Sequence, residues 1–138
     1  MPSIKHEQAV AKIVAEHKAE TTLFRKKVSE AVKDEHILWL RKQGYGKREA
    51  KQLAKMDLEM PHGDCLNLHP DAFKIYTDTV PPKLVIWEVE TSNLFKADKY
   101  SRVFWWLDQV EWELELIAVH TSSGATTTLE GLSLAFMT

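Results

Sequence analysis

Residues 84–90 have the sequence Leu84-Val85-Ile86-Trp87-Glu88-Val89-Glu90, in which four apolar residues are followed by two glutamates that are two positions apart. This run predicts a strand, and residues i and i+2 of a strand point to the same face of a sheet. Both glutamates therefore leave the strand on one side, beside Leu84 and Ile86. Burying two like charges is costly without compensation, and a divalent cation is the usual compensator.

The apolar spacing outward from this strand predicts helices before it and more strands after it. Spacings of three and four predict helix over residues 3–43 and again over 47–56, with a candidate break at Thr21-Thr22 and a stop at the Gly44-Tyr45-Gly46 turn. Strands are predicted over 72–78, 84–90, 113–120 and 126–136, with a helix over 100–111. This order indicates an α/β (α+β) fold, a mixed sheet with flanking helices and an N-terminal helical segment.

Length and composition predict one domain, with a helical part at 1–58 and a sheet-containing core at 59–138. The chain of 138 residues has one cysteine, Cys65, which is typical of a reducing cytoplasm. No run of eighteen apolar residues and no signal-peptide pattern is present, so we expect a cytoplasmic protein without a membrane anchor.

The charge is divided unevenly along the chain. Residues 1–59 carry a net charge of +4 and residues 60–138 a net charge of -6, which together give the -2 of the whole chain. A basic first part and an acidic second part would suit a polyanion held by one and a metal held by the other. An ordinary solvated helical surface has the same composition, and charge alone does not separate the two interpretations.

The prolines after residue 79 predict a hairpin between the first two strands. A turn centred between Val80 and Pro81 sets Asp71 opposite Glu90 and leaves Asp78 beside the turn, opposite Lys83. Asp71 is then the aspartate that meets the two glutamates. Three converging carboxylates suit Mg²⁺, which prefers oxygen ligands and keeps several waters.

Pro70-Asp71, followed by Glu88-Val89-Glu90 on an adjacent strand and then by a helix and another strand, resembles the PD-(D/E)xK nuclease superfamily. The resemblance covers roughly residues 30–120 and implies a restriction-endonuclease-like fold. It implies that Asp71 and Glu88 bind the metal and that Glu90 stands where the family usually has a lysine. Some members of the family have glutamate there. Lys99, at the start of the following helix, would supply the missing positive charge.

The expected activity is therefore Mg²⁺-dependent hydrolysis of phosphodiester bonds in DNA, with endonucleolytic cleavage favoured and with Mn²⁺ as a substitute ion. A chain this short covers little of a duplex, so a homodimer with one site per strand is expected. The small size would suit a phage or mobile-element enzyme in a bacterial cytoplasm.

A structural alternative applies to the acidic pair. Glu88 and Glu90 would simply face solvent on an edge strand, paired with Lys74 or Lys83, if Val85, Trp87 and Val89 formed the buried face. In that arrangement Asp71 only caps a turn.

A second reading of the chain concerns residues 36–58, which resemble a helix-turn-helix: a helix, a glycine turn and a basic second helix. Lys47, Arg48, Lys51 and Lys55 would offer cations to phosphates, and Arg102 would do so from a later helix. The alternative function is then a DNA-binding or regulatory protein without catalysis. A helical hairpin that covers the sheet, with solubilising lysines, explains the same residues.

Overall fold

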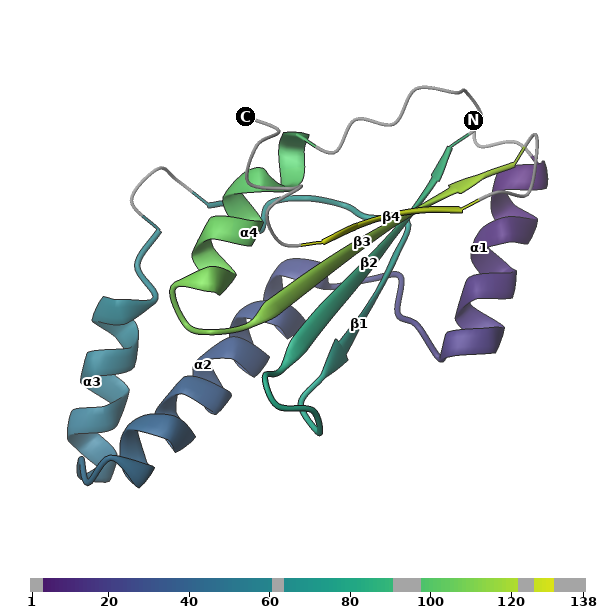
Figure 1. Cartoon of the computed structure of the whole chain (residues 1–138). Coiled ribbons are helices and arrows are strands. Elements are labelled where there is room, and N and C mark those ends of the chain that lie inside the picture. The colour runs from purple at the N-terminus through teal and green to yellow at the C-terminus, as the bar shows by residue number, and fades with distance from the viewer. Residues whose placement is uncertain (1–3, 61–63, 91–97, 122–125, 131–138) are drawn as a thin grey trace.

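A four-stranded mixed sheet with helices on both faces forms the centre of the protein (Figure 1). The structure is a computed structural model and describes residues 4–60, 64–90, 98–121 and 126–130. Its helices are α1 (Ile4–His17), α2 (Phe24–Lys42), α3 (Lys47–Asp57), the short 3-10 helix η1 (Asp98–Tyr100) and α4 (Ser101–Asp108). Its strands are β1 (Ala72–Tyr76), β2 (Lys83–Glu90), β3 (Glu113–His120) and β4 (Thr126–Glu130).

The strand order is β1-β2-β3-β4, so that β2 and β3 occupy the middle. β2 pairs antiparallel with β1 and parallel with β3, and β4 returns antiparallel to β3. The parallel pair requires a crossover, which η1 and α4 provide. The predicted α/β fold with a mixed sheet and N-terminal helices is confirmed.

The sheet separates two apolar layers, because alternate residues of β2 point to opposite faces. Leu84 and Ile86 lie in the larger core, against α2 and α4. Trp87 lies on the other face, where Ile13 of α1 covers it. Phe24 of α2 makes an edge-to-face contact with Phe73 of β1, at a centroid distance of 5.1 Å, which joins the start of α2 to the start of β1.

The predicted break in the N-terminal helix is present and is longer than the Thr21-Thr22 pair. α1 ends at His17 and α2 begins at Phe24, with Lys18 and Leu23 in the left-handed conformation at φ 54° and 59°. Between them Glu20 exchanges two backbone hydrogen bonds with Phe73, of 2.8 and 2.9 Å. The link thus leaves helical geometry because it pairs with the edge of β1.

Several element boundaries differ from the predicted ones. β1 ends at Tyr76 rather than at residue 78, and α4 ends at Asp108 rather than at residue 111, where Glu111 has a φ of 61°. β4 is described as far as Glu130, and the predicted continuation over 131–136 lies outside the described residues. No helix among the described residues is long and apolar enough to cross a membrane.

Candidate active site at the end of the central strand

Glu88 lies near the carboxyl end of β2, on the face that also carries Leu84 and Ile86. Only 6% of Glu88 is exposed, because β1 and β3 flank the strand and η1 and α4 cover this face. The alternative of a solvent-facing edge strand is therefore wrong for Glu88. Its proposed lysine partners lie elsewhere, since Lys74 donates to the carbonyl of His17 and Lys83 pairs with Glu115.

Two neighbouring residues of η1 satisfy the buried carboxylate. The Tyr100 hydroxyl donates a hydrogen bond to Glu88 Oε1, and Lys99 Nζ lies 3.4 Å from the same oxygen. Tyr100 is fully buried, whereas the Lys99 side chain is 49% exposed and also lies over the Tyr100 ring. The sequence singled out Lys99 as a helper of the acidic pair, and the structure brings it to Glu88.

The pKa of Glu88 is raised above its ordinary value. Burial is the largest cause, and the hydrogen bond from Tyr100 and the charge of Lys99 oppose it without cancelling it. The neighbouring Asp71 carboxyl raises the pKa of Glu88 further. Glu88 and Asp71 are thus carboxyl groups close enough to affect each other, and Glu88 is buried.

The pKa of the Tyr100 hydroxyl is also raised, first by burial and then by the charge and hydrogen bond of Glu88. The charges of Asp71 and Glu90 also raise the pKa of Tyr100, so all three predicted site carboxylates affect this hydroxyl. Tyr100 consequently remains a neutral hydrogen-bond donor at every physiological pH. The sequence analysis did not single it out, although it follows Lys99 directly.

Asp71 is positioned by β2 and by α1. Its Oδ2 accepts a hydrogen bond of 2.7 Å from the backbone N–H of Val89, and its Oδ1 lies 3.1 Å from Nε2 of His6. The ladder pairs Ala72 with Trp87, so its continuation sets Asp71 opposite Glu88 and not opposite Glu90 as predicted. The register differs by two residues because the ladder closes at Tyr76 and Lys83, which moves the turn centre toward β1.

His6 is a site residue that the sequence analysis missed. It lies on α1, more than sixty positions before Asp71, and only the folded arrangement brings the two together. The one sequence signal was its spacing: His6 precedes Val10 by four and Ile13 by seven, and both pack on the sheet. An open groove of about 630 Å³ runs along this side of α1, past His6, Pro70 and Asp71.

Glu90 is the last residue of β2 and is half-buried. Its backbone carbonyl accepts hydrogen bonds from the N–H and the hydroxyl of Thr121, at 3.0 and 3.2 Å. Within the part of the chain that the structure describes, no three His, Cys, Asp or Glu side chains are grouped so that they could hold one metal ion. The three carboxylates therefore do not form a ready-made ligand set, and the interacting pair is Asp71 and Glu88.

The predicted phosphate-binding cations fall into two places. Arg102 is exposed on the first turn of α4, where its charge lowers the pKa of the Cys65 thiol against the larger effect of burial. The other four, Lys47, Arg48, Lys51 and Lys55, are exposed on α3, which packs on α2 beyond the other end of the sheet (Figure 1). The helical hairpin is present, but α3 lies away from the sheet and does not cover it.

Comparison of the chain with protein-family models, with curated proteins and with solved structures finds no significant match. The chemistry of the site therefore has to be inferred from its own groups. They are a buried carboxyl with a raised pKa, a second carboxyl beside it, a half-exposed ammonium, a neutral phenol and an imidazole. Two adjacent carboxylates fit a hard divalent cation, since Mg²⁺ commonly takes one or two carboxylates and completes its shell with water and substrate phosphate.

Proposed function

We propose that the protein hydrolyses phosphodiester bonds in DNA with the help of a divalent cation, Mg²⁺ or Mn²⁺, held by Asp71 and Glu88. The observation that carries the proposal is the position of these two carboxyl groups: Asp71 accepts a hydrogen bond from the N–H of Val89, the residue after Glu88, and Glu88 is buried with a raised pKa. Two neighbouring carboxylates repel each other, and a shared proton or a bound cation relieves that repulsion. The order of the elements around it supports the same assignment, because the antiparallel β1-β2 pair is followed by a helix and by a strand parallel to β2.

The cation, when bound, would stabilise charge on the phosphoryl oxygens and acidify a water. The surrounding residues supply position. Tyr100 and Lys99 hold Glu88 Oε1, while Val89 N–H and His6 hold the two oxygens of Asp71. The exposed half of Lys99 can reach a phosphate oxygen of the substrate.

Glu90 is the candidate general base. It leaves β2 on the same face as Glu88, at the end of the strand, and remains half-buried without being enclosed. Its carboxylate would accept the proton of the attacking water. Glu90 stands where the PD-(D/E)xK nucleases, which this chain resembles, usually have a lysine. Lys99 of η1 would supply the positive charge of that lysine instead.

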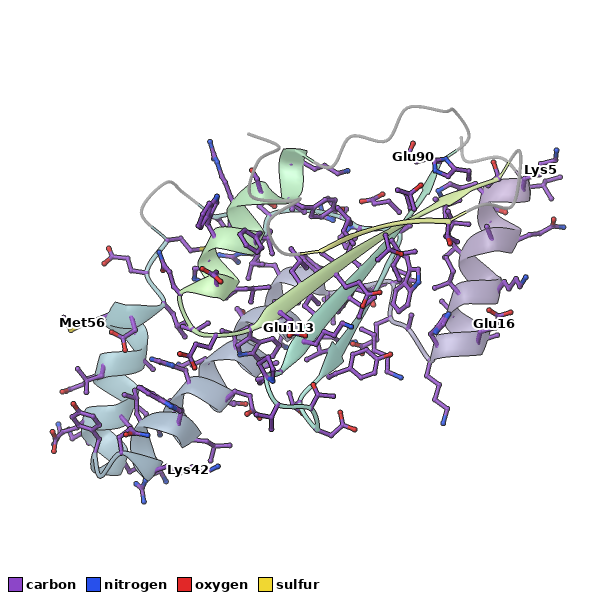
Figure 2. The ribbon with its side chains drawn as sticks, viewed as in Figure 1. Lys5, Glu16, Lys42, Met56, Glu90 and Glu113 are labelled. Atoms are coloured by element: carbon purple, nitrogen blue, oxygen red, sulfur yellow. The ribbon has the colours of Figure 1, made fainter. Side chains whose placement is uncertain are left out.

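Cleavage of supercoiled plasmid in the presence of Mg²⁺ or Mn²⁺ tests the proposal. Glu88→Gln and Asp71→Asn should each abolish nicking, because the ligand pair loses one charge. Glu113→Gln is the matched control: it removes a glutamate from the same sheet, at the opposite end from Glu90 (Figure 2), and should cleave normally. Equal cleavage by wild type and Glu88→Gln, or none by wild type with either ion, would contradict the proposal.

We also propose a homodimer, since one site in a chain of 138 residues acts on one strand and a duplex has two. Light scattering during gel filtration should give twice the chain mass of 15.9 kDa. A mass of one chain at all concentrations, for a preparation that cuts both strands, would contradict the dimer.

A further inference from the structure

The tip of the helical hairpin is a strongly cationic surface. Residues 41–56, here called the α2–α3 arm, hold one acid, Glu49, and six cations: Arg41, Lys42, Lys47, Arg48, Lys51 and Lys55. All six cations are exposed. None of them forms an ion pair with another residue of the described part of the chain.

The four cations of α3 form one stripe. At 3.6 residues per turn, positions 47, 48, 51 and 55 fall within about 100° of arc. The adjacent side of the helix carries Ala50 and Ala54, both fully buried against Leu40 of α2. α3 therefore presents its cations to solvent, beside the face that packs on α2.

Helix stability does not explain this stripe. Lys47 and Arg48 occupy the first turn of α3, where the helix dipole disfavours positive charge. Lys47, Lys51 and Lys55 follow each other at i, i+4, and like charges at that spacing weaken a helix. A helix selected only for solubility and stability would place acids between them, so the stripe indicates a negatively charged partner.

Two side-chain contacts hold the end of α3 that lies farthest along the chain from the tip of the hairpin. His36 of α2 lies 2.8 Å from Asp57 at the end of α3. Trp106 of α4 donates from Nε1 to the carbonyl of Leu58, at 3.0 Å, and is itself buried. The end of α3 is thus tied both to α2 and, just beyond it at Leu58, to α4.

We propose that the α2–α3 arm is a second DNA-binding surface, which holds the phosphate backbone of duplex DNA at a distance from Asp71 and Glu88. The inference rests on the proposed function for its connection with cleavage. A polyanion fits better than a protein, because protein interfaces are depleted of lysine at their centres whereas this stripe consists of lysine and arginine.

The length of α2 sets the separation of the two surfaces. The start of α2 contacts Phe73, two residues from Asp71, and its end carries the arm. A helix of 19 residues rises about 27 Å from its first residue to its last, which is about eight base pairs of duplex at 3.4 Å per step. A substrate that reaches the tip of the arm must therefore extend about eight base pairs beyond the cleaved bond.

The test is binding without cleavage. The Glu88→Gln protein is titrated, in EDTA, against a fluorescent 30-base-pair duplex at several salt concentrations. Adding Lys51→Ala and Lys55→Ala should reduce the slope of log K against log salt by about 1.8, and the affinity at 0.1 M salt by up to about 60-fold. The matched control adds Lys26→Ala and Lys33→Ala, two exposed cations of α2 outside the arm, and should bind as before.

Alanine is the best helix former, so both triple variants should fold, and circular dichroism checks this. Equal affinity and equal slope for the arm and control variants would overturn the inference. Equally tight binding of polyglutamate would overturn the assignment to DNA. Arm-dependent binding without cleavage by the wild type would leave the arm proposal standing and contradict only the nuclease, in favour of a DNA-binding protein. With Glu88 restored, plasmid cleavage that is insensitive to Lys51→Ala with Lys55→Ala would contradict only the arm.

Discussion

Replacing Tyr100 with phenylalanine should show how much the Tyr100 hydroxyl stabilises the protein through its hydrogen bond to the buried Glu88 carboxylate. The change removes only the hydroxyl that donates to Glu88 Oε1 and leaves the ring in place. Tyr100 is fully buried and Glu88 is 6% exposed, so water is poorly placed to replace the lost donor. The stability of the folded state should fall because a buried acceptor has lost a partner.

The size of the effect depends on the charge of Glu88. A hydrogen bond to a charged group contributes about 1.5–3 kcal/mol, and one between neutral groups about 0.5–1.5 kcal/mol. Unfolding entropy of about 2.1 cal/mol/K per residue makes 1 kcal/mol equivalent to roughly 3.4 °C in a chain of this length. Tyr100→Phe should therefore lower Tm by about 5–10 °C where Glu88 is ionised, and by about 2–5 °C where it is protonated.

The pH dependence has a definite sign. The pKa of Glu88 is raised on folding, so its contribution to stability is fully present below the unfolded pKa of about 4.3 and is lost as the pH rises through the folded pKa. Tyr100 is one of the groups that lower this pKa. Removing the Tyr100 hydroxyl should raise the pKa of Glu88 further, so that more folding stability is lost as the pH rises. The difference in Tm between wild type and Tyr100→Phe should therefore be larger at pH 7.5 than at pH 4.

A double-mutant cycle measures the coupling free energy between Tyr100 and Glu88. It compares the thermal unfolding of Tyr100→Phe, Glu88→Gln and the double variant with that of the wild type, in EDTA at both pH values. At pH 7.5 the coupling should be about 1 kcal/mol or more, because glutamine leaves only a neutral hydrogen bond. Tyr76→Phe is the control, with a change within about 0.5 kcal/mol. A coupling near zero, with an equal Tm loss at both pH values, would refute the reasoning.

Three other outcomes follow from the site and the arm. Mg²⁺ or Mn²⁺ at about 100 times its dissociation constant should stabilise the wild type by about 2.7 kcal/mol, which is measured as a higher Tm. The Tm of Glu88→Gln should not change, and equal Tm shifts for both proteins would exclude Glu88 as a ligand. His6→Ala should weaken Mn²⁺ binding about 10-fold in calorimetry by releasing Asp71, and unchanged affinity would show that His6 does not position it. The KM for cleavage should rise for duplexes that extend fewer than about eight base pairs beyond the cut, and a KM independent of length would separate the arm from catalysis.

Much of the fold was predictable because periodicity is local. In β3, for example, the residues alternate between the two faces of a strand, and the two apolar layers contain Leu114 and Leu116 on one side and Ile117 and Val119 on the other. The parity of β2 likewise placed Glu88 on the face of Leu84 and Ile86. The helical hairpin at residues 36–58 was predicted from a glycine turn between two periodic segments.

The pairing of Asp71 with Glu88 was not predictable in this way. A slip of one residue would turn every side chain to the wrong face, but a slip of two keeps each apolar residue on its own side. Hydrophobic pattern therefore cannot distinguish Asp71 opposite Glu90 from Asp71 opposite Glu88, and only the closure of the ladder at Tyr76 and Lys83 does so.

The amino-acid sequence by itself determined which elements form, which faces they bury, and that an acidic pair ends the central strand. The tertiary structure alone decided which groups surround Glu88 and Asp71. His6 arrives from α1, whereas Tyr100 and Lys99 arrive from η1. Those contacts join segments far apart in the chain, and burial between layers, which raises the pKa of Glu88, exists only once the layers have packed.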